Sequence, residues 1–427
     1  MLSGRCNKRN LRASLICAFA FAGLVLLSND QGPGHVGELF RAASKRQGKG
    51  LTVHDYERVL HRALASTADQ MSKVDLDQES ISRRALKKSN SPRSLTSDNT
   101  NYEIIKTAQN IHADNDGRAP FVFIMQCTVG MVEMIKSWIC NTKTMEGVHE
   151  STLLIVDEPS KKLLDDFEPA KGMHIVLDSL PTDMQEAWQY GTLGYWLAVQ
   201  HRFHTVFDIV ELGKVPIMII EPDAVWLENP LDDPVITDSD ADIIGYTDGK
   251  VGVNAIGFGF LRMQPTDTVI NLLRMAGESV DDSYEQAAER AGHDRRASAQ
   301  VYGEQRLLSE LIWSFREEHP EANFLEMLST CRYPSGMWYN HPSEIKEKCQ
   351  KEEKDPGSIV VLQNNWIVGN EAKVSRAKEW GHWFLSEGED RCLRTELKIA
   401  RQSVIRGTKP EPDDLVEEME VVDLAEE

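Results

Sequence analysis

The chain has 427 residues, of which 41% are hydrophobic and 27% are charged, a composition typical of a soluble globular protein with one large domain or two ordinary ones. Its formal net charge of −20 argues against nucleic acid as a partner, because a phosphate backbone requires a basic face. A single nucleotide remains compatible with this charge, because one local basic or metal-binding site can hold a diphosphate.

The N-terminus has the pattern of a targeting signal. Basic residues within residues 1–12 precede an uncharged and mostly apolar run at residues 13–28. Such a run is either a cleaved signal peptide or a retained anchor that spans the bilayer. No small-x-small cleavage site follows Leu27, so we favour a transmembrane signal anchor. The positive-inside rule then places residues 1–12 in the cytosol and the rest of the chain in the secretory lumen.

Polar segments are expected on both sides of a folded region. Residues 29–117 are rich in Ser, Asp, Lys and Arg and poor in aromatic residues, which predicts a stem that holds a folded domain away from the membrane. The folded domain is expected at residues 118–400 and a solvated acidic tail at residues 401–427.

The cysteines fit an oxidising compartment. Five of them lie in the expected lumenal part, so at least one thiol has no partner within the chain. We expect Cys331 to pair with Cys349, and the alternative is that all five are ordinary thiols.

Strand-like apolar runs alternate with helical patterns in the central region. Strands are expected at residues 121–125, 151–156, 173–177, 215–220, 242–246 and 255–263, and helices at residues 132–140 and from a cap at residue 183 to about residue 203. This alternation favours an α/β fold whose sheet is covered on both faces. In such sheets ligands bind at the carboxyl ends of the strands.

Two carboxylates stand at one of these strand ends. Glu221 and Asp223 follow the apolar run at residues 215–220 and precede another at residues 224–227. A charge beside a core must be paired, protonated or bound to a metal. We interpret the pair as ligands of a hard divalent cation that is shared with a phosphate, as in an enzyme that activates a nucleotide sugar. The alternative is a charged turn after a strand.

Six short blocks, in this order, resemble the nucleotide-diphospho-sugar transferase family, whose members are type II membrane glycosyltransferases with a GT-A fold. The blocks are WQYG at 188–191, IIEPDAVWLENP at 219–230, GFLRMQPT at 259–266, GEQRLL at 303–308, YPSG at 333–336, and NNWIVGN at 364–370 followed by Lys373. The resemblance covers roughly residues 118–385. It implies a GT-A-like, Rossmann-type mixed sheet flanked by helices, in a single-pass Golgi membrane protein whose catalytic domain is lumenal.

The resemblance also implies a role for each matching position. Glu221 and Asp223 would hold a divalent cation, usually Mn²⁺, that bridges the phosphates of a UDP-sugar, with Asp223 the stronger candidate for a direct ligand. Glu304 and Gln305 would face the donor or acceptor sugar as the catalytic candidates. The positions expected to bind the nucleotide are Cys127, Thr128, Asn365, Trp366, Gly369 and Lys373.

The predicted activity is transfer of a hexose or pentose from a UDP-sugar to a glycan or glycoprotein acceptor, with retention of the anomeric configuration. Four positions depart from the family pattern: Glu221 and Glu304 each replace an Asp, Gly257 replaces an Asn, and Gln363 replaces a His that is a plausible third metal ligand. Gly257 and Gln363 favour the alternative, a catalytically inactive relative that binds glycans or sugar nucleotides, or scaffolds other Golgi enzymes.

Overall fold

The computed structural model describes residues 99–410, except residues 116, 179–189, 249–254, 300, 302, 352–358, 387, 389–390 and 394–395. The expected cytosolic tail, the signal anchor, residues 29–98 of the expected stem and residues 411–427 of the expected tail lie outside the described residues. Among the helices of the described part, none has the length and apolar character needed to cross a membrane.

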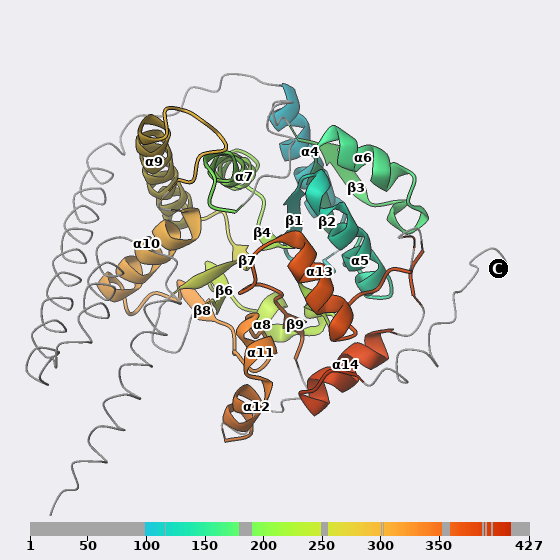
Figure 1. The fold of residues 1–427 in the computed structure, drawn as a ribbon. Helices are drawn as coiled ribbons and strands as arrows, with labels where there is room; N and C mark the ends of the chain where they lie inside the picture. Colours follow the sequence, from blue (N-terminus) through green and yellow to red (C-terminus); the bar gives the residue numbers. More distant parts are fainter. Residues whose placement is uncertain are drawn as a thin grey trace, which may run out of the picture. The chain divides into compact units, whose positions relative to one another are not determined.

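A seven-stranded mixed sheet forms the centre of the fold (Figure 1). Its strand order is β3 (His174–Leu177), β2 (Thr152–Val156), β1 (Val122–Cys127), β4 (Ile217–Ile220), β7 (Ile256–Met263), β6 (Ile243–Thr247) and β8 (Leu325–Met327). The first four are parallel, β7 is antiparallel to both β4 and β6, and β8 is parallel to β6. A separate antiparallel pair joins β5 (Val225–Trp226) to β9 (Val361–Leu362). The expected mixed α/β sheet is therefore confirmed.

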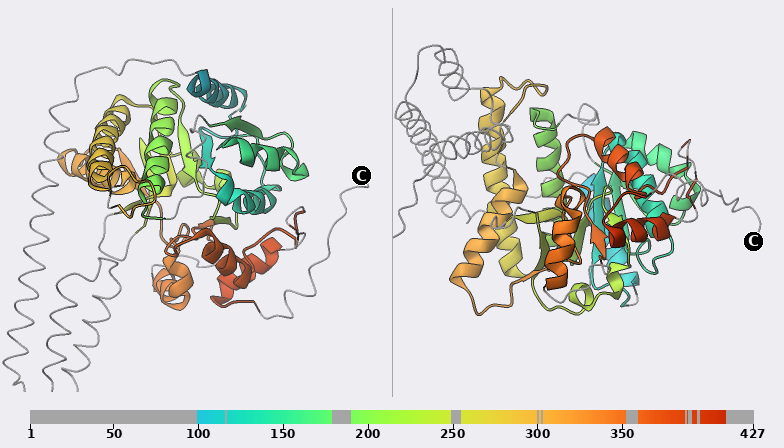
Figure 2. Two further views of the ribbon diagram at one scale, coloured as in Figure 1. Left: turned by 45° about the horizontal axis from the view of Figure 1, so that its top comes forward. Right: turned by 60° about the horizontal axis from the view of Figure 1, so that its bottom comes forward.

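Helices cover both faces of this sheet, as the two views in Figure 2 show. Alternate residues of β1 enter two separate hydrophobic clusters, because side chains of a strand point to opposite faces with a period of two. One cluster includes residues of α4 (Asn99–Asp114), α7 (Leu193–Glu211), α9 (Asp267–Arg290) and α10 (Glu304–Glu318). The other includes residues of α5 (Val132–Thr142), α6 (Glu158–Asp165), α13 (Asn370–Glu379) and α14 (Glu396–Arg406).

Shorter helices connect these elements. They are η2 (Val129–Met131), η3 (Glu168–Ala170), η5 (Pro230–Asp232), α8 (Pro234–Thr237), α11 (Met337–Asn340) and α12 (Pro342–Lys351).

The folded unit extends beyond residues 118–400 at both ends. Helix α4 lies within the segment that we expected to be a stem, yet it buries Ile104, Ala108 and Ile111 against the sheet. Helix α14 continues past residue 400, where we expected the acidic tail to begin, and Val404 on it is buried. Both helices are amphipathic, so their apolar stripes pack although their overall composition is polar.

Helix α7 is longer at its C-terminal end than the sequence pattern indicated, since it continues past residue 203 to Glu211. Its N-cap is Thr192, whose Oγ1 accepts a hydrogen bond from the Tyr195 amide at 3.3 Å. Gly191, just before the cap, has a φ of 80° that favours glycine. The expected cap at residue 183 lies outside the described residues.

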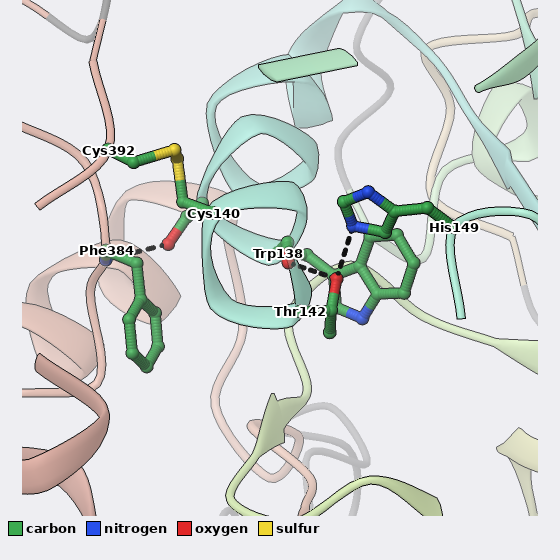
Figure 3. The surroundings of a disulfide bond; sticks show 7 residues. Trp138, Cys140, Thr142, His149, Phe384 and Cys392 are labelled. Atoms are coloured by element: carbon green, nitrogen blue, oxygen red, sulfur yellow. Dashed lines mark hydrogen bonds between the residues drawn. A yellow bond between two sulfur atoms is a disulfide. The ribbon is translucent and has the colours of Figure 1, made fainter. Parts of the chain in front are cut away.

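Two disulfide bonds brace the side of the fold that carries α5 and α12. The expected pair of Cys331 and Cys349 is confirmed. A second bond, between Cys140 and Cys392, ties α5 to the segment that follows α13 (Figure 3). The sequence did not indicate this second pair, because its members are 252 residues apart.

Candidate functional site

The turn that carries the two strand-end carboxylates is held by its buried flank. Glu221 and Asp223 connect β4 to β5, and Trp226 of β5 is fully buried. The Asn141 side chain donates to the Trp226 carbonyl and accepts from its amide, both at 2.8 Å. The Trp226 ring lies 5.3 Å from that of Phe123 on β1. These contacts fix the backbone on one side of the turn, so the carboxylates project from a rigid base.

Asp223 forms an ion pair with Lys373. The Lys373 Nζ lies 2.6 Å from Asp223 Oδ2, and the Asp223 side chain is only 3% exposed. Burial lowers the pKa of Lys373, but Asp223 and Glu221 outweigh it, so the net shift is upward and the amine stays protonated. Helix α13 is fixed in this position because Asn364 Nδ2 donates to the Lys373 carbonyl at 2.9 Å and Asn364 Oδ1 accepts from Arg376 Nε at 2.7 Å.

Arg202 of α7 joins the predicted metal ligand Glu221 to the predicted catalytic residue Glu304. Its two terminal nitrogens each lie 3.1 Å from one of these carboxylates. Burial lowers the pKa of Arg202, but the two carboxylates outweigh it and the net shift is upward. Burial raises the pKa of Glu304, and Arg202 opposes that shift. Sequence reasoning missed Arg202, because a single arginine inside an amphipathic helix carries no local signal.

Asp248 gathers three of the predicted site residues. Its carboxylate accepts hydrogen bonds from Gln305 Nε2 at 2.8 Å, Asn365 Nδ2 at 2.6 Å and Trp366 Nε1 at 3.0 Å. Burial raises the pKa of Asp248, and the bonds from Gln305 and Trp366 oppose the rise. Trp366 is 44% exposed and has a φ of 61°, a strained conformation for an aromatic residue. Asp248 was also missed, although it follows the end of β6.

The loop after β1 approaches α13. Asn370 Nδ2 donates to the Gly130 carbonyl at 2.6 Å, so this loop is bonded to the segment that carries Gly369 and Lys373. Thr128 is half-buried, and Gly369 is the N-cap of α13 with a φ of 95°. Among the cysteines that the structure describes, Cys127 is free and buried, and burial raises its pKa, so it stays neutral. The predicted nucleotide-binding residues therefore lie on adjacent segments.

Gln363 is a buried amide that faces the carboxylates. A Cβ placed on Gly259 would lie 2.6 Å from Glu221 Oε2 and 3.3 Å from Gln363 Oε1. Neither polar atom of the Gln363 side chain has a hydrogen-bond partner, and the residue is 2% exposed. An unpaired buried amide is costly. Gln363 Oε1 and Glu221 Oε2 thus both lie next to Gly259, and the amide oxygen has no donor.

Close packing requires glycine at two positions, Gly257 and Gly336. A Cβ on Gly257 would lie 2.1 Å from the ring of Tyr246, so no larger residue fits there without a shift. A Cβ on Gly336 would lie 2.0 Å from the Asn365 carbonyl oxygen. The replacement of the family's Asn by Gly257 therefore has a steric explanation in this chain, because the Tyr246 ring occupies the space of a side chain.

Neither His382 nor His341 replaces the imidazole that position 363 lacks, although His382 lines the same small cavity as Asp223. His382 is buried, and its ring nitrogens contact Tyr339 Oη at 2.8 Å and Ser403 Oγ at 2.9 Å. His341 is near Glu344 on the surface. Over the ranges that the structure describes, no three His, Cys, Asp or Glu side chains cluster as a metal site. Any cation at this site would need further oxygen atoms besides those of Glu221 and Asp223, from an amide side chain or from a bound small molecule.

We expect His382 to make the fold sensitive to acid. Burial lowers its pKa from 6.5 to about 3, so between these values only the unfolded chain gains a proton, and stability falls as the pH drops. Between pH 7 and pH 5, protonation of His382 in the unfolded chain should lower the free energy of unfolding by about 2 kcal/mol. Urea unfolding should show that His382→Gln loses about 2 kcal/mol less over this interval than the wild type does. The surface variant His341→Gln should keep the wild-type dependence, and an unchanged dependence in His382→Gln would contradict the assignment.

The chain is thus an α/β protein with a charged site at the carboxyl ends of its central strands. The family model described as nucleotide-diphospho-sugar transferase matches residues 146–377. This match covers more than half of the chain, so the protein belongs to the nucleotide-diphospho-sugar transferase family, as the sequence blocks indicated.

Similar proteins are known from plants. The chain is 21% identical over 281 residues to the UDP-D-xylose:L-fucose alpha-1,3-D-xylosyltransferase MGP4 of Arabidopsis thaliana, covering 62% of this chain and 71% of that protein. A second UDP-D-xylose:L-fucose alpha-1,3-D-xylosyltransferase of the same plant is 21% identical over 300 residues, covering 64% and 72%.

Similar solved structures include mouse xyloside xylosyltransferase 1 in its apo form, with 12% identity and a TM-score of 0.36, covering 58% of this chain and 99% of that one. The glycosyltransferase GlyE of Streptococcus pneumoniae TIGR4 has 11% identity and a TM-score of 0.35, covering 68% and 65%.

Proposed function

We propose that this protein is a GT-A-type glycosyltransferase that moves a sugar from a UDP-sugar to a glycan or glycoprotein acceptor, as a single-pass type II protein of the Golgi membrane. The observation that carries the proposal is the pairing of two strand-end carboxylates with two cations, Glu221 with Arg202 and Asp223 with Lys373. Such a site offers positive charge to a diphosphate and carboxylates to sugar hydroxyls. The names of the plant relatives make UDP-xylose the first donor to test and a fucoside the first acceptor.

The charges suit the departure of a diphosphate. In the transfer, the bond from the anomeric carbon to the diphosphate breaks, the acceptor oxygen bonds to that carbon, and the acceptor proton passes to the diphosphate oxygen. Lys373 would neutralise the charge that develops on the leaving group. Glu304 and Gln305 would face the sugars, with Gln305 oriented by Asp248. Retention of configuration is proposed from the resemblance to the family.

A divalent cation fits the oxygens at the site. Asp223 Oδ1 and Gln363 Oε1 have no hydrogen-bond partner, and Asp223 Oδ2 contacts Lys373 Nζ at 2.6 Å. Carboxylate and amide oxygens are ligands that Mg²⁺ and Mn²⁺ accept. We therefore propose that Glu221, Asp223 and Gln363 would hold the cation, which would supply additional charge stabilisation for the leaving diphosphate.

A second function, sugar-nucleotide binding without transfer, is favoured by Gln363. An amide is a poorer ligand for Mn²⁺ than an imidazole or a carboxylate, and Lys373 and Arg202 already neutralise the two carboxylates. Under this reading the protein binds UDP-sugars or glycans, or scaffolds other Golgi enzymes.

Release of UDP by the purified full-length protein tests the proposal. The protein is incubated with Mn²⁺ and each of a panel of UDP-sugars, with and without methyl α-L-fucoside. We expect release from one donor, and a loss of about a hundredfold or more in Asp223→Asn, because the variant removes a charged ligand of the cation that would stabilise the leaving diphosphate. Chelation of the cation should lower release as well.

The matched control is Asp165→Asn, which alters an exposed carboxylate on α6 and should leave release unchanged. Binding of UDP without release from any donor would support the second function. Equal release by the wild type and Asp223→Asn would show that the carboxylate site does not act on the donor.

A further inference from the structure

Three aromatic side chains form a patch at the start of α7, which we call the aromatic patch. Its members are Tyr190, Tyr195 and Trp196. The ring centroid of Tyr190 lies 5.0 Å from that of Tyr195 and 6.1 Å from that of Trp196, and the latter two are 5.1 Å apart. Tyr190 nevertheless remains 57% exposed. The exposed face of Tyr190 is open to a ligand, and its contacts with Tyr195 and Trp196 hold the ring in place.

The aromatic patch lies against the catalytic end of α10. Trp196 Nε1 donates to the Ala299 carbonyl at 3.0 Å, and a Cβ on Gly303 would lie 2.8 Å from the Trp196 ring. Gly303 is the N-cap of α10 and directly precedes Glu304. Burial raises the pKa of the Tyr195 hydroxyl, and the nearby carboxylate of Glu304 raises it further. The patch and the Glu304–Arg202 ion pair are therefore neighbours.

This position suits one kind of ligand, a pyranose ring. A pyranose offers an apolar face of C–H bonds to an aromatic ring, while its hydroxyls can reach the carboxylate and guanidinium beside it. The Tyr190 ring is already held by two other rings, so stacking a sugar on it costs little conformational entropy. The diphosphate, in contrast, would be neutralised by Lys373 of α13, which lies beside Asp223.

We propose that the aromatic patch is the acceptor subsite, where the exposed face of Tyr190 stacks on a sugar ring of the acceptor glycan and presents it to Glu304. This inference rests on the proposed function and specifies where its acceptor binds. It assigns a task to Tyr190 of the block at 188–191, for which the resemblance alone gave no role.

Saturation-transfer NMR with the full-length protein tests the subsite without requiring turnover. The probes are methyl glycosides of fucose, galactose, glucose, mannose, xylose and N-acetylglucosamine. We expect the wild type to saturate ring protons of at least one glycoside, and Tyr190→Ala to weaken its binding by about fivefold to tenfold, as for other aromatic stacking contacts. Tyr190→Phe, which keeps the ring face, should retain the binding.

The matched control is Tyr102→Ala, which removes a tyrosine on α4 that is 62% exposed and should not affect glycoside binding. The inference is overturned if no glycoside binds the wild type, or if binding survives in Tyr190→Ala. Acceptor-free UDP release, measured on the same preparations, reports on the proposed function separately. This release should be equal in the wild type and Tyr190→Ala. If the wild type binds a glycoside through Tyr190 but releases no UDP, the proposed transferase activity is refuted, whereas the glycan-binding subsite is supported.

Discussion

Replacement of Arg202 by methionine is expected to lower UDP release by about a hundredfold or more and to destabilise the fold by about 3–5 kcal/mol at neutral pH. Arg202 is the cation between Glu221 and Glu304, and all three side chains are less than a third exposed. Methionine fills a similar volume but leaves two carboxylates facing each other without a partner. Breaking a buried ion pair in this way costs more than the pair contributes, because the remaining charges stay desolvated.

The loss of stability should depend on pH. Without Arg202 the pKa of Glu304, which burial already raises, rises further. The folded state of Arg202→Met then binds a proton more readily than its unfolded state. The stability that this variant loses relative to the wild type is therefore largest at neutral pH and shrinks as the pH falls. Urea unfolding at pH 7 and pH 5 measures this change.

Two further variants separate the charge effect from lost packing. Arg202→Met combined with Glu304→Gln removes one of the unpaired charges, so it should be more stable than Arg202→Met alone. Arg274→Met breaks an ion pair of comparable exposure between α9 and α7, with Glu211, and should leave UDP release unchanged. If Arg202→Met loses no more stability than Arg274→Met, the expectation that Glu221 and Glu304 need Arg202 as a partner in the folded state is wrong.

The part of the site that is local in sequence could be predicted. Glu221 and Asp223 interrupt two apolar runs, so a charged strand end was visible without a structure, and β4 and β5 indeed flank it. Lys373 and Asn365 were indicated by a block of matching residues. Their placement beside Asp223 and Asp248 depends on the β5–β9 pairing, which no local pattern shows.

The part that depends on tertiary contacts could not be predicted. Arg202 is one of several polar residues in the amphipathic helix α7, and its role appears only when α7 packs beside α10. Asp248 has a weak signal as an acid after a strand, but its three donors come from segments about 57 and 117 residues away. The helix α4 was assigned to a stem because its composition is polar, while its buried stripe of Ile104, Ala108 and Ile111 decides its packing.

Of the two disulfide bonds in the described part, Cys140–Cys392 is the one whose loss is expected to lower stability more. Closing a loop of 252 residues restricts the unfolded chain strongly, which corresponds to about 5 kcal/mol at 25 °C. The bond also joins α5 to the segment where the Phe384 amide donates to Ser137 Oγ at 3.1 Å (Figure 3). For a domain of this size, Cys140→Ser with Cys392→Ser should lower the melting temperature by roughly 10 °C.

The matched comparison is Cys331→Ser with Cys349→Ser, whose loop spans 18 residues and whose loss should cost only about 3 kcal/mol. Calorimetry of both double variants, each with the other disulfide intact, ranks the two bonds. UDP release at 25 °C should persist in the Cys140–Cys392 variant, because Lys373 and Asp223 are held by Asn364 and Arg376 rather than by the disulfide. An equal or larger loss from the short loop would show that native packing, and not the unfolded chain, sets the contribution of these bonds.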